Sequence, residues 1–362
     1  MKIIIVGTAY PYRGGLAAFN ERLAREFVRQ GNEVEIYTFT LQYPSFLFPG
    51  KTQLSDDEAP GDLKINRRIN SVNPLNWVSV GREIKAKNPD KIIFCYWMAF
   101  MAPCFGTIAR FAKREKTKII SLVHNMIPHE PTILDKLFPR YFVKAMDGFV
   151  AMTASVVEDI NKFDNKNKPK LVSPHPIYDH YGAITPRSEA LDALDLDPAF
   201  RYVLFFGFIR KYKGLDLLME AFADVRLRQF PVKLLVAGEF YEPKEPCFEM
   251  IRKYALEDLV VLHTDFIPEK EVAFYFNAAD LVAQPYRSAT QSGVSQIAYH
   301  FEKPMLVTNV GGLAETVPNG KVGYVVEPEV SKIADALVDF FENNRSTKFI
   351  ENLKEEKKKY DW

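Results

Sequence analysis

The sequence predicts an α/β protein built from two doubly wound domains. Short apolar strands alternate with longer amphipathic segments, the pattern of a mostly parallel sheet with helices on both faces. The chain has 362 residues, 47% of them hydrophobic, so it can fill two cores. Its rhythm breaks between about 163 and 200 and then restarts. We expect domains at 1–178 and 179–343, and a final helical segment at 344–362 that could cross back to the first domain.

The first half supplies the elements of the first domain in order. A strand at 2–7 leads into a helix at 16–30, which Gly31 stops. The apolar residues of that helix recur at helical spacing: Leu16, Phe19, Leu23 and Phe27. Further strands are expected at 33–39, 91–97, 118–124 and 147–152.

Residues 92–109 run for 18 positions without a charge, which is almost the length of a membrane span. Pro103 and Gly106 interrupt the run, and its first residues are the β-branched and aromatic types of a buried strand. We therefore predict a strand at 91–97 and a helix that opens near Pro103, where proline is tolerated in a first turn.

The second half repeats the alternation. Strands are expected at 202–207, 232–238, 259–263, 281–286, 304–309 and 323–326. Helices are expected at 214–226, 247–256, 269–278, 292–301 and 329–343, with a very charged last helix at 351–362.

Charge, cysteines and the first residues exclude several classes. A net charge of +1 gives no support for a general nucleic-acid binder. The three cysteines form no CxxC and lie in or beside apolar stretches, as expected for buried thiols in a reducing cytoplasm. The opening MKIIIVG is typical of a first strand and not of a signal peptide.

Ligands of open α/β sheets bind at the carboxyl ends of strands, so the loops there are the candidates. In the first domain, Gly14 and Gly15 precede a helix whose amides could face an anion, although the loop lacks a GxGxxG dinucleotide motif. His124 ends a strand, and His129 and Glu130 follow it; these side chains could contact a sugar hydroxyl or exchange a proton. Simple turn glycines and strand-end histidines are the alternatives.

In the second domain, two loops carry the pattern of a diphosphate site. Gly207 turns the chain before Arg210, Lys211 and Lys213, cations beside a helix N-terminus. The segment 290–293, TQSG, opens another helix with hydroxyls and free amides. A solvated basic turn and simple capping by a serine are the alternatives. An Asp195-Leu196-Asp197 triplet could hold a metal, but it lies in the irregular junction, and nothing else indicates a metal.

These loops, taken in order, resemble glycosyltransferase family 4, retaining enzymes of the GT-B fold with two Rossmann-like domains that face each other across a cleft. The segments that carry the resemblance are Gly14-Gly15, SLVHN, FGFIRKYKGLDLLMEAF, LLVAGEF, NAADLVAQPY, QSGV, EKPMLVTNVGGLAETV and NGKVGYVVEP. It covers nearly all of the chain and is strongest from 202 to 327. It implies a nucleotide-sugar donor, UDP- or GDP-linked, held by the second domain and an acceptor held by the first.

The resemblance also implies roles for particular residues. Lys213, with Arg210, would hold the donor diphosphate, and His124 would contact the donor sugar. The remaining donor residues would be Gly14, Gly15, Gly207, Gly238, Glu239, Phe266, Ile267, Gln291, Ser292, Gly293, Val294 and Glu315. In this family the leaving phosphate is thought to help deprotonate the incoming hydroxyl, so the protein positions groups and stabilises charge without a cofactor.

Two departures from the family pattern concern the sugar. Phe208 stands where members commonly carry an arginine, and Ala289 and Ile297 stand where they commonly carry two glutamates. The nearest polar substitutes are Gln291 and Gln296. A non-catalytic partner subunit and a sugar-nucleotide epimerase of the same fold are the alternative functions.

The acceptor side is expected around 41–53, where Tyr43, Phe46 and Phe48 cluster between prolines. An apolar loop of this kind could touch lipid or grip a bulky acceptor, and His129 and Glu130 would lie on the same side. We hypothesise a lipid-linked glycan acceptor at the inner face of the membrane, with peripheral contact there. A loop packed on its own domain is the alternative.

Overall fold

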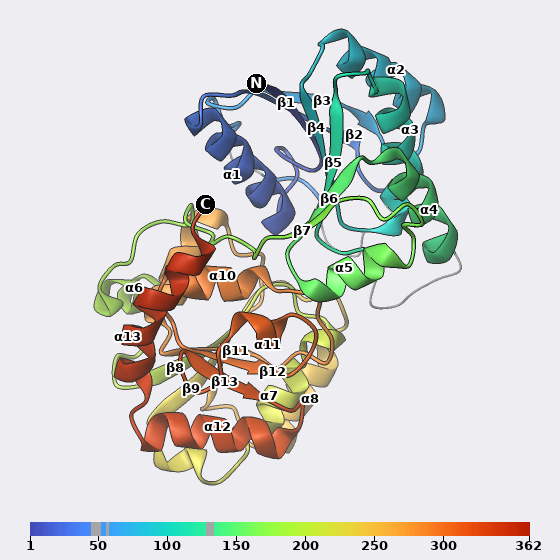
Figure 1. Cartoon of the computed structure of the whole chain (residues 1–362). Helices are drawn as coiled ribbons and strands as arrows, with labels where there is room; N and C mark the ends of the chain where they lie inside the picture. Colours follow the sequence, from blue (N-terminus) through green and yellow to red (C-terminus); the bar gives the residue numbers. More distant parts are fainter. Residues whose placement is uncertain (45–51, 56–57, 128–133) are drawn as a thin grey trace. The chain divides into compact units, whose positions relative to one another are not determined.

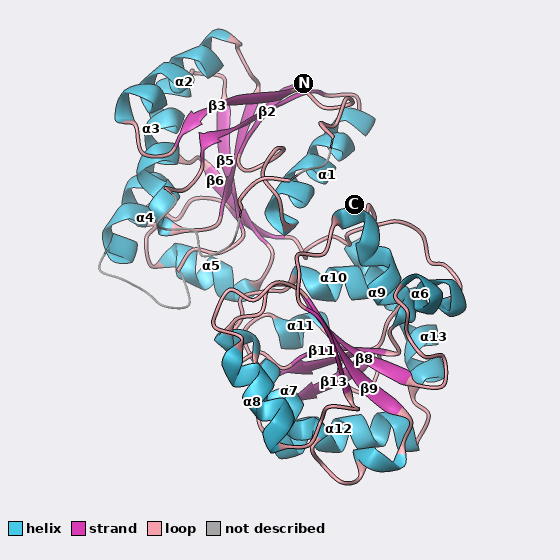
Figure 2. Cartoon of the chain, turned by 180° about the vertical axis from the view of Figure 1, so that it is seen from behind, coloured by secondary structure: helices cyan, strands magenta, loops and turns pink. Residues whose placement is uncertain are grey.

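The computed structural model describes residues 1–44, 52–55, 58–127 and 134–362. They form two compact units, Met1–Pro174 and His175–Trp362 (Figure 1). In each unit helices lie on both faces of one sheet (Figure 2). The pairings between neighbouring described strands are parallel in both sheets. The two doubly wound folds predicted from the alternating pattern are therefore confirmed.

The sheet of the first unit has the order β3-β2-β1-β4-β5-β6-β7. Its strands are β1 (Lys2–Val6), β2 (Glu33–Leu41), β3 (Ile65–Asn70), β4 (Lys91–Tyr96), β5 (Lys118–Val123), β6 (Gly148–Ala151) and β7 (Lys170–Val172). Its helices are α1 (Gly15–Arg29), α2 (Pro74–Ala86), the 3₁₀ turn η2 (Ala99–Met101), α3 (Ala102–Ala112), α4 (Leu134–Ala145) and α5 (Ala154–Asn161).

The sheet of the second unit has the order β10-β9-β8-β11-β12-β13. Its strands are β8 (Arg201–Phe206), β9 (Val232–Ala237), β10 (Val260–His263), β11 (Leu281–Gln284), β12 (Met305–Thr308) and β13 (Gly323–Val326). Its helices are α6 (Arg187–Ala193), α7 (Leu215–Phe222), α8 (Glu245–Lys253), α9 (Val272–Ala278), α10 (Gly293–His300), α11 (Leu313–Thr316), α12 (Val330–Glu342) and α13 (Ser346–Glu356). Short 3₁₀ turns are η3 (Lys211–Lys213), η4 (Leu227–Gln229), η5 (Glu269–Glu271) and η6 (Lys357–Tyr360).

Both sheets have a point at which the strand order reverses. β1 lies between β2 and β4, and β8 lies between β9 and β11. Ile5 of β1, for example, lies beside Ile36 on one side and Ile93 on the other. At such a point the loops after neighbouring strands run in opposite directions, and a crevice forms between them. This topology places the loops after β1, β8 and β11 where ligands of open α/β sheets bind.

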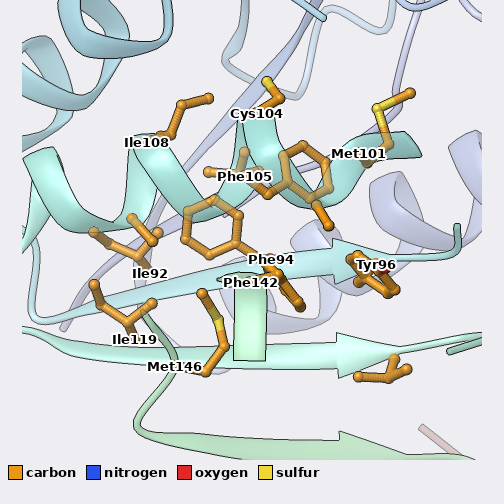
Figure 3. Close-up of a cluster of buried hydrophobic side chains, with 14 of the residues drawn as sticks. Ile92, Phe94, Tyr96, Met101, Cys104, Phe105, Ile108, Ile119, Phe142 and Met146 are labelled. Atoms are coloured by element: carbon orange, nitrogen blue, oxygen red, sulfur yellow. The ribbon is translucent and has the colours of Figure 1, made fainter. Parts of the chain in front are cut away.

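The uncharged run 92–109 folds as β4, η2 and α3, as predicted, with Pro103 in the first turn of α3. Its aromatic side chains fill the core between the sheet and α3 and α4 (Figure 3). The ring centroid of Phe105 lies 5.5 Å from that of Phe94 and 6.4 Å from that of Phe142. Among helices of the described residues, none combines the length and the apolar character that a membrane crossing needs.

Several predicted bounds differ from the structure. The helix expected at 214–226 ends at Phe222, because the Asp224 carboxylate accepts the Arg226 N–H at 2.9 Å and holds a turn instead. The junction expected to be irregular contains β7 and α6. The last helix, α13, belongs with the second unit, where the Lys321 ammonium pairs with Glu356 at 2.5 Å.

Candidate active site

The loop after β8 places a buried cation at the carboxyl end of the sheet. Gly207 has a φ of +93°, where a side chain would be strained. The turn η3 then folds Lys213 back, so that its Nζ would lie 3.0 Å from a Cβ on Gly207. Only 9% of Lys213 is exposed. Within the described residues no carboxylate forms an ion pair with it, and the charge that acts on it is that of Arg210.

This lysine is electrostatically suited to an anion. Burial, and secondarily the charge of Arg210, lower the pKa of Lys213 to about 8. Its Nζ lies 5.6 Å from the centre of the Tyr286 ring, a weaker partner than a carboxylate. A buried ammonium without a counter-ion is costly, and a bound phosphate would remove that cost.

The loops after β8 and β9 pack against each other through two glycines. Gly238 has a φ of +145°, and a Cβ there would lie 2.3 Å from the Gly207 carbonyl oxygen. Beyond them, Ile209 N–H donates to the Glu239 carbonyl at 2.9 Å, and Tyr241 N–H donates to the Ile209 carbonyl at 3.1 Å. The Glu239 side chain is buried. The parallel pairing thus extends past the sheet edge and fixes the direction of the Phe208–Arg210 segment.

An aromatic wall lies beside the cations. The Phe208 ring centroid is 4.3 Å from that of Tyr241 and 6.4 Å from that of Phe266. The Arg210 guanidinium lies 5.0 Å from the Tyr241 ring centre. Phe208 and Arg210 are two positions apart on extended backbone, so their side chains lie on the same side. Ile267, next to Phe266, is half-buried. Flat, half-buried rings of this kind can stack on a nucleobase.

The N-terminus of α10 adjoins the lysine loop. The Ser292 hydroxyl caps the helix by accepting the Val294 N–H at 3.2 Å. The Val294 side chain would lie 4.0 Å from a Cβ on Gly207. Gln291, half-buried, precedes the cap, and Gly293 is the first residue of the helix. The amides of this first turn therefore lie on the same side of the unit as Lys213.

Arg287, which the sequence prediction did not single out, ties the two loops together. Its guanidinium makes two 2.6 Å bonds to the Asp216 carboxylate and donates to the Lys211 carbonyl at 3.1 Å. Its own N–H donates to the Tyr212 carbonyl at 2.6 Å. No short motif marks this arginine, since its partners lie about 70 residues earlier in the chain.

Glu315 lies on the short helix α11, which begins beside the same loop. Gly312 N–H donates to the Thr290 carbonyl at 3.0 Å, and Gly311 approaches Ala289 so closely that a Cβ would meet its carbonyl. The Glu315 side chain is exposed. The structure therefore brings the donor residues expected in the second domain to one edge of one sheet.

The two positions that lack the usual glutamates are apolar and buried. Ala289 is 9% exposed and Ile297 is 5% exposed. Gln296 is also buried, at 2% exposure, so it does not reach the surface as a substitute. Only Gln291 of the two glutamines reaches solvent.

The first unit holds its own candidate residues near α1. Gly14 precedes α1 with a φ of +104°, and Gly15 is the first residue of the helix and is exposed. His124 follows β5 and is 5% exposed. Its ring meets the ring of Phe19 from α1 edge to face, with centroids 5.0 Å apart. The first helix and His124 are therefore in contact within this unit.

Tyr43, expected on the acceptor side, packs into its own unit. Its hydroxyl accepts the Trp97 Nε1 hydrogen at 2.6 Å, and its ring lies 6.2 Å from that of Phe100. It is partly buried against the core. This geometry agrees with the alternative of a loop packed on its own domain. The other acceptor-side candidates lie outside the described residues: Phe46, Phe48, His129 and Glu130.

The aspartates of the 195–197 triplet make local contacts. The Asp197 carboxylate accepts the Ala199 N–H at 2.9 Å, and Asp195 has a φ of +53° in the turn after α6. In the part of the chain that the structure describes, no three histidine, cysteine or acidic side chains gather closely enough to hold a metal ion.

Comparison with known protein families covers both units. The model of Glycosyltransferase Family 4 matches residues 13–177, and that of Glycosyl transferases group 1 matches residues 200–343. An uncharacterised glycosyltransferase of Methanocaldococcus jannaschii is 24% identical over 100% of this chain and 95% of its own length. A D-inositol 3-phosphate glycosyltransferase of Jonesia denitrificans is 25% identical over 86% of this chain and 79% of its own length.

Solved structures share the fold. Anabaena HepE, determined in complex with UDP-glucose, aligns with a TM-score of 0.77 at 15% identity, over 100% of this chain and 96% of that one. WaaG, a glycosyltransferase involved in lipopolysaccharide biosynthesis, aligns with a TM-score of 0.70 at 16% identity, over 99% and 95%. The chain is a glycosyltransferase, and it belongs to glycosyltransferase family 4 with the GT-B fold.

Proposed function

We propose that this glycosyltransferase moves a hexose, with retention, from a UDP- or GDP-sugar to a glycan or lipid-linked glycan of a cell-surface polysaccharide, without a metal. The observation that carries the donor side is Lys213, which is buried beside Arg210 and the first turn of α10 and has no carboxylate partner among the described residues. Cations and amides aimed at one place are the groups that stabilise a departing diphosphate.

The aromatic wall supports a nucleotide over a simple phosphate. Phe208, Tyr241 and Phe266 lie beside Arg210, so a base and a diphosphate could be held side by side. HepE, whose fold matches, was solved with UDP-glucose. The donor panel described below contains both UDP- and GDP-hexoses and so distinguishes uracil from guanine.

The retaining step needs little from protein carboxylates. The departing phosphate takes the proton of the incoming hydroxyl on the same face of the sugar, while Lys213 and Arg210 hold the charge that develops on it. The positions of the usual glutamates hold Ala289 and Ile297, so the contact that the second unit makes to the sugar would come from Gln291.

Turnover of a donor panel tests this assignment. The purified chain is incubated with UDP- and GDP-hexoses and glycolipid extracts, and release of nucleoside diphosphate is measured. Lys213→Ala should abolish release, since removal of one charge-stabilising donor typically costs about 10²- to 10³-fold in rate. Lys253→Ala, an exposed lysine of α8 outside the candidate site, is the control and should retain activity. Undiminished release by Lys213→Ala would refute the proposed site.

We also propose that the chain contacts the membrane peripherally, through a basic aromatic face of the first unit. Its residues are Arg82 and Lys85 of α2, Arg110 and Phe111 of α3, Arg114 just after α3, and Leu137, Arg140, Tyr141 and Lys144 of α4. Phe111, Leu137 and Tyr141 are 39%, 58% and 40% exposed. The Arg110 guanidinium lies 3.8 Å from the Tyr141 ring centre.

Such a face suits anionic lipid. The Arg82 guanidinium lies 5.7 Å from the Phe111 ring centre, so cations and apolar groups alternate between neighbouring helices. Basic side chains attract an anionic surface, and apolar ones enter its interface. Sedimentation with vesicles that contain phosphatidylglycerol, but not with pure phosphatidylcholine vesicles, is expected. Equal recovery in both supernatants would refute peripheral membrane contact.

A further inference from the structure

The backbone conformation of Gly293, at the start of α10, does not require a glycine. Its φ lies outside the left-handed region that favours glycine. A Cβ there would lie 2.9 Å from Cε2 of Tyr178, closer than side chains tolerate. The space that a side chain would need is therefore filled by the tyrosine ring.

Tyr178 has little freedom to move aside. It is 4% exposed, and its ring contacts those of His175, His180 and Tyr181 at centroid distances of 5.1, 5.3 and 5.8 Å. His175 is itself buried, with Nδ1 2.7 Å from the Pro176 carbonyl. The ring is therefore held from several sides against the first turn of α10.

The residue before Tyr178 is fixed by the last residues of the chain. The Ile177 N–H donates to the Tyr360 carbonyl at 2.9 Å, and the Ile177 carbonyl accepts the Trp362 Nε1 hydrogen at 2.8 Å. Both backbone polar groups of one residue are thus bound by a segment 183 to 185 positions later in sequence.

That final segment is anchored in turn on the other part of α10. The rings of Tyr360 and Tyr299 lie 4.7 Å apart, and both hydroxyls donate to the Thr316 carbonyl, at 3.2 and 2.7 Å. Lys357 pairs with Glu302 at 2.6 Å. Residues 175–182 and 357–362, which we call the tail brace, therefore contact α10 near both of its ends.

We propose that the tail brace positions the first turn of α10, and that Tyr178 is the residue through which it acts on the donor-phosphate loop. Tyr178 is a positioning residue: the amides around Gly293 face the anion, and the ring sets where they stand. The inference deepens the proposed function and rests on it for the identity of the anion.

A double-mutant cycle tests the contact. Gly293→Ala should weaken UDP or GDP binding, measured by calorimetry, by about tenfold or more, because the new methyl pushes the loop off the ring. Tyr178→Ala alone should cost less. The double variant Gly293→Ala/Tyr178→Ala should bind within about threefold of Tyr178→Ala, because the obstacle is gone. Full addition of the two losses would overturn the proposal.

Two further variants test the ring and the tail separately. Tyr178→Phe keeps the ring, so it should not rescue Gly293→Ala; rescue by it would contradict the steric account. Trp362→Phe removes only the bond to Ile177 and should lower nucleotide affinity about threefold in the wild type but not in Tyr178→Ala. Asp361→Asn is the matched control in the tail and should bind as the wild type does. An unchanged affinity in Trp362→Phe would exclude the tail from the brace.

Unfolding measurements make failure of the two proposals distinguishable. If the wild-type protein binds neither UDP nor GDP, the proposed function fails. The urea unfolding midpoints of the same variants then still test the contact between Gly293 and Tyr178. The Gly293→Ala loss in midpoint should then shrink by at least about half in the Tyr178→Ala background. An equal loss in both backgrounds would overturn the brace by itself.

Discussion

Replacement of Lys213 by methionine should make the protein more stable and less able to bind a nucleotide. The pKa of Lys213 is lowered from 10.5 to about 8, chiefly by burial. That difference of about 2.5 pH units corresponds to about 3 kcal/mol of unfavourable free energy in the charged, anion-free state at pH 7. Methionine keeps the volume and removes the charge, so a gain of about 1–3 kcal/mol in unfolding free energy is expected.

The same difference predicts a pH dependence. The folded chain gives up this proton near pH 8, while the unfolded chain holds it to about pH 10.5, so the unfolded state binds more protons in between. The contribution of Lys213 to the free energy of unfolding therefore rises between pH 8 and 10.5. The Lys213→Met variant should lack this rise. Urea unfolding at several pH values measures it.

Lys303 provides a matched control. It is also buried, and burial lowers its pKa to about 8, but its ammonium donates to the Asn277 carbonyl at 3.1 Å. Lys303→Met should remove a similar part of the pH dependence and leave nucleotide affinity unchanged. A Lys213→Met protein that is less stable than wild type at pH 7, or that binds UDP and GDP as tightly, would refute the electrostatic argument.

Three further outcomes are expected. Gly238→Ala should destabilise the second unit by about 2 kcal/mol or more in urea unfolding, because its Cβ would meet the Gly207 carbonyl at 2.3 Å; a loss below about 0.5 kcal/mol would contradict the close packing. Arg287→Ala should raise the calorimetric Kd for nucleoside diphosphate about three- to tenfold, because its two bonds to Asp216 are lost. An unchanged affinity would show that Arg287 is not needed to position the two loops. Arg110→Glu should reduce sedimentation with anionic vesicles, whereas Lys348→Glu on α13 should not; equal effects would assign the binding to net charge alone.

The parts of the fold that could be predicted are those with local periodicity. β1 and β8 are continuous apolar runs, as expected of strands buried on both faces. The loops that follow them contain glycines, which the sequence alone indicates as turns. β3 was not predicted, because its residues INRRIN are those of a partly exposed edge strand. Its pattern gives neither an apolar run nor a clean alternation.

The candidate site divides in the same way. Lys213 and Ser292 stand beside glycines in short motifs, so their positions followed from the sequence. Tyr178 could not be assigned, because the role proposed for it depends on its contact with Gly293 and on the bonds of its neighbour Ile177 to a segment more than 180 positions away. Tyr43 was expected on the acceptor side, with packing on its own domain as the alternative; its hydrogen bond with Trp97, 54 positions later, agrees with the alternative.

Comparison of nucleoside diphosphates with their parent nucleosides shows whether the second unit binds a diphosphate through Lys213. Calorimetric titration at pH 7 compares UDP with uridine and GDP with guanosine on the wild-type chain. We expect one site per chain and, for one of the two bases, a diphosphate affinity at least about tenfold above that of the nucleoside, with that advantage lost in Lys213→Met. Equal affinity for diphosphate and nucleoside, or an advantage that survives in Lys213→Met, would contradict it.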